Sequence, residues 1–268
     1  MKTPVTPLLL TSRRSTPEYW LLAACGPVLV GAALLGWQLS WLSAYTTAIG
    51  FLLLAALVAT HSRARSFGVA DVVTLARGLG VCFLAGLALQ ALAGLASRGV
   101  WTMIIMGTVC LTLDGVDGRV ARARGEASAF GARFDVETDA AMLAVLSVAV
   151  AGLGIAGWWV LAIGGMRYSY VAASLLVPAL RTPLPYRYSG KVIAVIQAVA
   201  LLVALTFRLT HGAHWMVTTF LLIALALLCW SFGRSVLWQL RHSSRTITLQ
   251  PAGLKRAWGE SLSASHKP

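Results

Sequence analysis

Long apolar runs separated by short polar segments dominate the chain from residue 20 onward. Each run approaches the ~20 residues that an α-helix needs to cross the hydrocarbon core of a bilayer. The predicted spans are Trp20–Trp37, Tyr45–Thr60, Val72–Ala96, one from Val100 that is apolar only to Leu113, one from Asp135 to Ala151, Trp158–Leu180, Val192–Phe207 and Trp215–Leu240. This pattern predicts an all-α polytopic membrane protein, a bundle of about eight transmembrane helices.

Composition supports the same class. Hydrophobic residues make up 58% of the chain and charged residues 12%, and the mean hydropathy is +0.76, which is too apolar for a soluble domain of 268 residues. The four cysteines each stand alone within an apolar run. They lack the spacing of metal ligands or of a disulfide framework, so they are predicted to be small packing residues.

The distribution of Lys and Arg predicts the orientation of the bundle. Eight spans would place both termini on one side of the membrane. Arg98 and Arg208 are the only basic residues at the loops predicted for one side, whereas the tails, the 61–71 loop and the 181–191 loop lie on the other. Because cytoplasmic loops are enriched in Lys and Arg, both termini are predicted to be cytoplasmic. The formal net charge of +13 suits anionic membrane lipids, and no basic-aromatic patch indicates a nucleic-acid partner.

Six of the nine acidic residues fall between Asp114 and Asp139. On one helix, Asp114, Asp117, Gly118 and Ala121 lie within an arc of roughly 100°. On the next helix, Gly131, Asp135 and Asp139 lie within an arc of about 80°. Two helices joined by a short turn around Gly125 would therefore aim four carboxylates at one point. Like charges at close range need cations, and hard divalent ions take oxygen ligands. The pattern thus predicts a metal site at a membrane face, where the apolar run ends.

The spacing of this segment resembles the signature of the CDP-alcohol phosphotransferase family. Asp-x-x-Asp-Gly-x-x-Ala-Arg starts at Asp114, and after eight residues Gly-x-x-x-Asp-x-x-x-Asp starts at Gly131, so every fixed position matches. The resemblance implies transfer of a phosphatidyl group, or a related phosphoalcohol, from a CDP-linked lipid such as CDP-diacylglycerol to an alcohol. CMP would be released, as a step of phospholipid biosynthesis. The apolar runs predict a multi-pass protein, of a bacterial-type cell membrane, and the Lys and Arg bias predicts that its active site lies at the cytoplasmic face.

The resemblance covers residues 66–240, in which six helices would form the catalytic core. The predicted hairpin over residues 19–60 lies outside that core. It is an accessory element, either for packing or for a homodimer. Residues 1–18 and 241–268 are predicted to be cytoplasmic tails.

Carried over residue by residue, the resemblance implies a binuclear metal site. Two Mg²⁺ ions, or Mn²⁺ as the alternative, would be bound by Asp114, Asp117, Asp135 and Asp139. Displacement at a pyrophosphate requires a charged leaving group to be neutralised, which a pair of metal ions does well. Asp139 would also act as the catalytic base that takes the proton from the attacking hydroxyl.

Small and cationic residues of the same region would contact the CDP donor. Gly118 and Ala121 leave room for a nucleotide, and Arg122 offers planar donors for a phosphate. Two of the implied residues have a second interpretation: Ser128 as a helix cap, and Arg77 as a cation that snorkels to the membrane surface. The full donor set implied by the resemblance is Asp71, Thr74, Arg77, Gly118, Ala121, Arg122, Ser128 and Gly131.

Three further cations are candidates for binding the acceptor alcohol. Arg167, Arg187 and Lys191 are predicted to lie near the cytoplasmic ends of the sixth and seventh spans, beside the carboxylates. They would meet the phosphate of an acceptor such as glycerol 3-phosphate or inositol phosphate. The alternative is that they only follow the positive-inside bias of cytoplasmic loops.

Two other classes of membrane protein also use clustered acidic residues. A UbiA-type prenyltransferase has two aspartate-rich motifs, but far more chain separates them than lies between Asp117 and Asp135, and it lacks the Gly-x-x-Ala-Arg element. A cation-coupled transporter usually holds its carboxylates near mid-membrane on broken helices, whereas these begin where an apolar run ends. Both classes stand as alternatives to the phosphotransferase.

Overall fold

The computed structural model describes residues 40–62, 69–124, 129–181, 188–210 and 214–264, and every regular element within these ranges is helical. The α-helices are α2 (Trp41–Ser62), α3 (Val69–Ala93), α4 (Ser97–Arg124), α5 (Ala129–Gly152), α6 (Leu161–Leu176), α7 (Tyr188–Thr210) and α8 (His214–Ala264). The all-α prediction is confirmed for the described part of the chain. The first predicted span, Trp20–Trp37, lies outside it.

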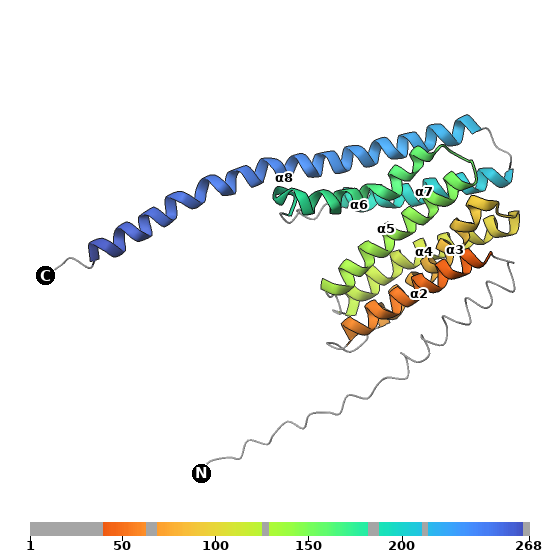
Figure 1. Cartoon of the computed structure of the whole chain (residues 1–268), viewed down its shortest axis with the longest axis horizontal. Coiled ribbons are helices and arrows are strands. Elements are labelled where there is room, and N and C mark those ends of the chain that lie inside the picture. The colour runs from red at the N-terminus through yellow and green to blue at the C-terminus, as the bar shows by residue number, and fades with distance from the viewer. Residues whose placement is uncertain (1–39, 63–68, 125–128, 182–187, 211–213, 265–268) are drawn as a thin grey trace, which may run out of the picture.

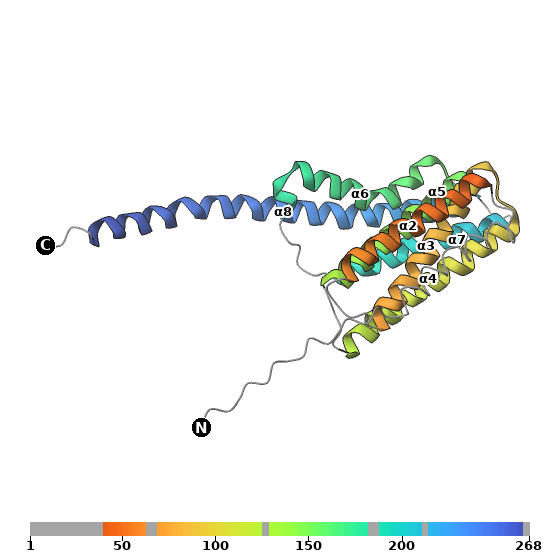
Figure 2. The same ribbon diagram turned by 60° about the horizontal axis from the view of Figure 1, so that its bottom comes forward.

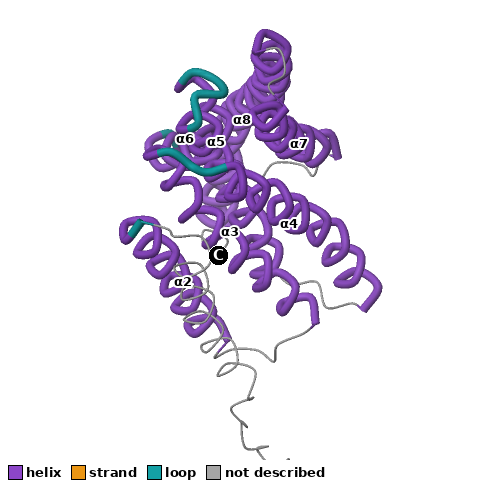
Figure 3. Tube along the Cα trace, turned by 90° about the vertical axis from the view of Figure 1, so that its right-hand side faces the viewer, coloured by secondary structure: helices purple, strands orange, loops and turns teal. Residues whose placement is uncertain are grey.

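The helices pack into one bundle, in which α3 and α7 each contact three other helices (Figures 1 and 2). α3 packs against α2, α4 and α5, and α7 packs against α8, α4 and α5. Seen along another direction, α3 lies between α2 and α4 (Figure 3). Apolar side chains fill the space between the helices, and Leu84, Leu87, Leu146 and Leu201 are completely buried. The bundle therefore has a continuous apolar core, built by the apolar runs of the sequence.

Polar residues gather at one end of this bundle. Successive helices run in opposite directions, so α3, α5 and α7 begin at the end where α4 finishes. Ion pairs between Arg77 on α3, Asp114 on α4 and Lys191 on α7 hold these termini together. We call this region the polar end of the bundle.

The backbones of α5 and α6 approach each other closely at Gly164. A Cβ atom at this position would lie 2.3 Å from the Cα atom of Ala144 and 2.9 Å from the carbonyl oxygen of Leu143. The neighbouring Gly165 has open space at the same position. Only glycine permits such an approach, so Gly164 fixes how tightly α6 packs on α5.

The sixth apolar run, predicted as one span over Trp158–Leu180, is divided into three helical pieces. A 3₁₀-helix at Trp158–Val160 precedes α6, and a second one at Pro178–Arg181 follows it. The break lies at Val177, which is extended (ψ 103°), because a residue before proline disfavours the helical conformation. Gln239 of α8 holds the second 3₁₀-helix in place, since its Nε2 donates to the carbonyl oxygen of Leu180 over 3.1 Å.

Three helices in the described residues are long and apolar enough to cross a membrane, over Leu75–Ala93, Ser189–Thr210 and His214–His242. The last of these is the start of α8, whose 51 residues span about 75 Å at 1.5 Å per residue. Its C-terminal half projects past the other helices (Figures 1 and 2). Residues 241–264, predicted as part of a tail, are therefore a continuation of the last helix.

Candidate active site

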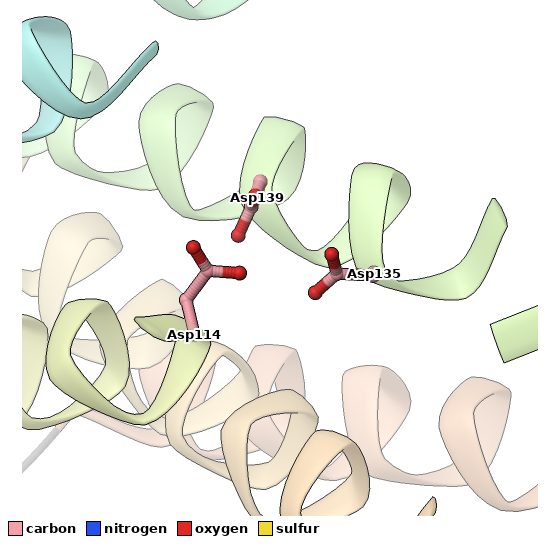
Figure 4. Close-up of side chains that lie close together, drawn as sticks. All are labelled: Asp114, Asp135 and Asp139. Atoms are coloured by element: carbon pink, nitrogen blue, oxygen red, sulfur yellow. The ribbon is translucent and has the colours of Figure 1, made fainter. Parts of the chain in front are cut away.

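Three aspartates of α4 and α5 point toward one another at the polar end of the bundle (Figure 4). Asp114, Asp135 and Asp139 each offer a carboxylate oxygen, and these oxygens all lie within 4.8 Å of one another. Asp135 and Asp139 are one helical turn apart, which places them on one face of α5. Asp114 approaches that face from α4 and is buried. The packing of two helices thus brings three negative charges into one small volume.

A third helix, α3, supplies a cation to these carboxylates. The Nη1 atom of Arg77 on α3 lies 3.1 Å from Oδ1 of Asp114 and 2.5 Å from Oδ1 of Asp135, and Nη2 forms an ion pair with Oδ1 of Asp139. The Arg77 side chain is only 1% exposed. Sequence reasoning placed Arg77 in the donor set or at the membrane surface. In the structure it does not snorkel to the surface but points inward, into the aspartate cluster.

An apolar pocket adjoins the carboxylates between α4, α5 and α7. Lys191 lies at its polar side, with Nζ 3.8 Å from Oδ2 of Asp114. The lining residues are Leu111, Asp114, Asp139, Met142, Leu143, Lys191, Ala194, Val195 and Ala198. The carboxylates are therefore in contact with a space that has both charged and apolar walls.

The donor atoms of this cluster fit a divalent metal ion. Carboxylate oxygens are the ligands that Mg²⁺ and Mn²⁺ prefer, and three of them within 4.8 Å can close around one ion. Asp117, the fourth predicted ligand, lies three residues after Asp114 on α4, and its side chain is outside the described residues. The described part of the chain thus offers three of the four predicted metal ligands in one place.

The candidate acceptor residues are in different situations. Lys191 lines the pocket. Arg167, on α6, forms an ion pair with the half-exposed Glu137 of α5 rather than with an aspartate of the cluster. Arg187 lies outside the described residues. Of these three cations, only Lys191 is seen beside the carboxylates.

Most of the candidate donor residues can be placed only by their helices. Asp71 and Thr74 belong to the first turns of α3, and Gly131 to the start of α5. Gly118, Ala121 and Arg122 lie on the last turns of α4. The side chains of this set are outside the described residues, and so is Ser128 altogether. Their contacts with a donor stay a prediction.

Comparison with known proteins gives the family. A family model described as CDP-alcohol phosphatidyltransferase matches residues 67–231, which is more than half of the chain. Two curated relatives, from two strains of Mycobacterium tuberculosis, are named "Probable phosphatidylglycerophosphate synthase" and are 33% identical over 141 residues. The match covers 52% of this chain and 66% of each relative, just under two thirds of its length. No solved structure matches.

The matched range includes α3, α4, α5, α6 and α7, and hence every described residue of the aspartate cluster. It begins close to the start of the predicted catalytic core at residue 66, and it supports the phosphotransferase over the prenyltransferase and the transporter. Together with the three apolar helices, it indicates an integral membrane protein. The chain therefore belongs to the CDP-alcohol phosphatidyltransferase family, a family of phosphotransferase enzymes.

Proposed function

We propose that the protein transfers a phosphatidyl group from CDP-diacylglycerol to an alcohol acceptor and releases CMP, in a reaction that depends on divalent metal ions. The observation that carries this proposal is the convergence of Asp114, Asp135 and Asp139 within 4.8 Å of one another. In an apolar bundle, such a concentration of negative charge is costly unless cations bind it. The family match gives the class of donor.

The proposed metal ligands are Asp114, Asp117, Asp135 and Asp139, holding two Mg²⁺ or Mn²⁺ ions. When bound, such ions neutralise the pyrophosphate oxygens of the donor and the leaving CMP. The four carboxylates would hold the ions, and two of them, Asp114 and Asp139, also line the apolar pocket.

Asp139 is the proposed catalytic base. It belongs both to the aspartate cluster and to the pocket lining, so an acceptor hydroxyl in the pocket would be within its reach. The hydroxyl oxygen attacks the phosphorus of the phosphatidyl group, and its proton passes to the Asp139 carboxylate. The bond between that phosphorus and the CMP oxygen breaks, and CMP leaves with the bonding electrons.

The proposed acceptor is an anionic alcohol. The name of the two relatives, phosphatidylglycerophosphate synthase, makes glycerol 3-phosphate the first candidate, because its transfer product would be phosphatidylglycerophosphate. Lys191 supports this choice, since it is a cation in the pocket wall beside the carboxylates. Arg187 and Arg167 are the further proposed contacts, although Arg167 would have to leave Glu137 to reach an acceptor.

The donor would lie along the end of α4. Gly118 and Ala121 would admit the nucleotide, and Arg122 would bind a donor phosphate. Asp71, Thr74, Arg77, Ser128 and Gly131 complete the proposed donor site.

The proposed membrane arrangement has eight spans, with both termini and the polar end of the bundle at the cytoplasmic face of a bacterial-type cell membrane. The excess of Lys and Arg on that side supports this orientation. The hairpin over residues 19–60 would lie outside the catalytic core. A homodimer through that hairpin is a further proposal.

The direct test is a transfer assay with purified protein. CDP-diacylglycerol is incubated with glycerol 3-phosphate, inositol phosphate, free inositol or free glycerol, in the presence of Mg²⁺, Mn²⁺ or a chelator. CMP release with glycerol 3-phosphate, lost on chelation, is the expected result. A phosphatidyl product formed only with a neutral alcohol would contradict the anionic acceptor. An absence of CMP release with every alcohol would contradict the function itself.

A further inference from the structure

Arg77 lies at the point where the three carboxylates of the cluster converge. Its guanidinium contacts the Oδ1 atom of each aspartate, and the side chain is 1% exposed. It is the only charged residue of the Leu75–Ala93 span. A buried cation in an apolar helix is expected to have a specific electrostatic partner, and here it has three.

We propose that Arg77 is the chain's own counter-ion for the aspartate cluster, and that a divalent ion binds there by displacing the guanidinium from some of these oxygens. The metal-binding half of this inference rests on the proposed function. The guanidinium and a metal ion would share the same carboxylate groups. The carboxylates that would ligate an ion are those of Asp114, Asp135 and Asp139, and Arg77 contacts all three.

In this proposal Arg77 stabilises the metal-free protein and weakens the binding of a metal ion. Three carboxylates at a buried site repel one another, so the guanidinium stabilises the fold when no divalent ion is bound. The same positive charge repels a metal ion at short range and competes with it for oxygen atoms, so it weakens metal binding. A residue that only filled space would leave metal affinity unchanged. A residue that held the carboxylates in a ligating arrangement would strengthen it.

Lys191 provides an internal comparison. Its Nζ atom lies 3.8 Å from Oδ2 of Asp114, but its side chain is 44% exposed and contacts one carboxylate of the cluster. Water screens such a cation, and it can move away at little cost. Lys191 is therefore expected to influence metal affinity much less than Arg77.

The experiment measures metal binding and stability in Arg77→Gln and Arg77→Lys, purified in detergent. Mn²⁺ affinity is obtained from the electron paramagnetic resonance signal of free Mn²⁺, and stability from thermal unfolding with chelator or with Mn²⁺. Arg77→Gln should unfold at a lower temperature in chelator, bind Mn²⁺ about tenfold more tightly, and gain more from Mn²⁺ than the parent protein. Arg77→Lys, which keeps the charge, should lie between the two. Arg98→Gln, which removes an exposed arginine, is the charge-matched control and should change neither quantity.

A double-mutant cycle separates the charge of Arg77 from its packing. Where Arg77→Gln alone is too unstable to purify, the counter-ion role predicts that adding Asp114→Asn restores folded protein, and a failure to restore it overturns that role. Asp114→Asn removes one negative charge from the cluster. The counter-ion role predicts that Arg77→Gln lowers the unfolding temperature less in the Asp114→Asn background than in the parent protein. Equal losses in both backgrounds would mean that Arg77 acts only by packing, and would overturn the proposal.

The two proposals fail in different ways. Weaker or unchanged Mn²⁺ binding in Arg77→Gln overturns the counter-ion role and leaves the proposed function standing. An absence of Mn²⁺ binding in the parent protein, by contrast, overturns the metal site and with it the displacement of Arg77 by metal. The double-mutant cycle in chelator still decides the counter-ion half, because it involves no metal.

Discussion

At the scale of single residues, the proposed metal binding depends on which carboxylates lie close to one another. Asp135 and Asp139 share a face of α5, while Glu137, between them in sequence, points elsewhere and pairs with Arg167. The side chain of Glu137 is 52% exposed, whereas that of Asp114 is 6% exposed. Three acidic residues within five positions of one helix thus divide into two cluster members and one surface residue.

This division gives the first prediction. Asp114→Ala and Asp135→Ala should each lower the rate of CMP release by more than tenfold, about 1.4 kcal/mol of barrier, because each removes a proposed metal ligand. Glu137→Gln removes a carboxylate from the same helix but not from the cluster, so it should retain Mn²⁺ binding. Transfer assays together with Mn²⁺ titrations check this. A ligand variant with more than about a tenth of parental activity would contradict shared coordination.

The second prediction concerns the acceptor. Lys191→Ala should raise the KM for glycerol 3-phosphate by tenfold or more, because a charge-assisted hydrogen bond to phosphate contributes about 1.5–3 kcal/mol. The KM for CDP-diacylglycerol should change little. Arg167→Ala should have a smaller effect, since its guanidinium is already paired with Glu137. Steady-state kinetics provide the measurement. An unchanged acceptor KM in Lys191→Ala would mean that this lysine does not bind the acceptor and only follows the positive-inside bias of cytoplasmic loops.

The sequence predicts those features of the site that depend on spacing within one helix. It does not predict those that depend on how different helices pack together. The spacing of Asp135 and Asp139 predicts a shared face, because one helical turn separates them. The place of Arg77 was missed, because it depends on how α3 packs against α4 and α5. One signal was available in the sequence. A lone arginine in an otherwise uncharged apolar run requires an acidic partner, and six of the nine acidic residues lie between Asp114 and Asp139.

At the scale of elements, apolar length predicted where helices form, but not where they break. The runs from Tyr45, Val72, Val192 and Trp215 each lie within a helix or overlap one closely. The run from Trp158 does not form a single helix, and Pro178 was a local signal of that break. How closely α6 approaches α5 could not be predicted, since it depends on which of two neighbouring glycines faces the contact.

The third prediction separates those two glycines. Gly164→Ala should lower the free energy of unfolding by about 1–3 kcal/mol, because its Cβ would collide with the Ala144 backbone 2.3 Å away. Gly165→Ala adds a methyl group where space is open and should be neutral, or stabilising by up to about 1 kcal/mol. Thermal or denaturant unfolding of both variants in detergent provides the comparison. Equal stabilities would show that α5 and α6 are less tightly packed than described.

At the scale of the whole molecule, the proposed function requires the polar end of the bundle to face the compartment that holds the soluble substrates. The fourth prediction is that a reporter fused after Pro268 is cytoplasmic, while one inserted at Gly212, between α7 and α8, is external. Cysteine labelling with a membrane-impermeant reagent distinguishes the two. A reporter in the 182–187 segment, which directly precedes α7 in the sequence, should behave like the first. Labelling of Pro268 and Gly212 from the same side would contradict the eight-span arrangement.

The position of Arg77 also implies an order of assembly during synthesis. Its most distant partner, Asp139, is 62 residues further along the chain, so α3, α4 and α5 together hold the three aspartates and their counter-ion. The pocket beside them needs α7, which is translated later. Because a chain is made from its N-terminus, the charges of the site can neutralise one another while the ribosome is still producing the second half of the protein. The three aspartates can thus be paired with Arg77 before α7 completes the pocket that borders them.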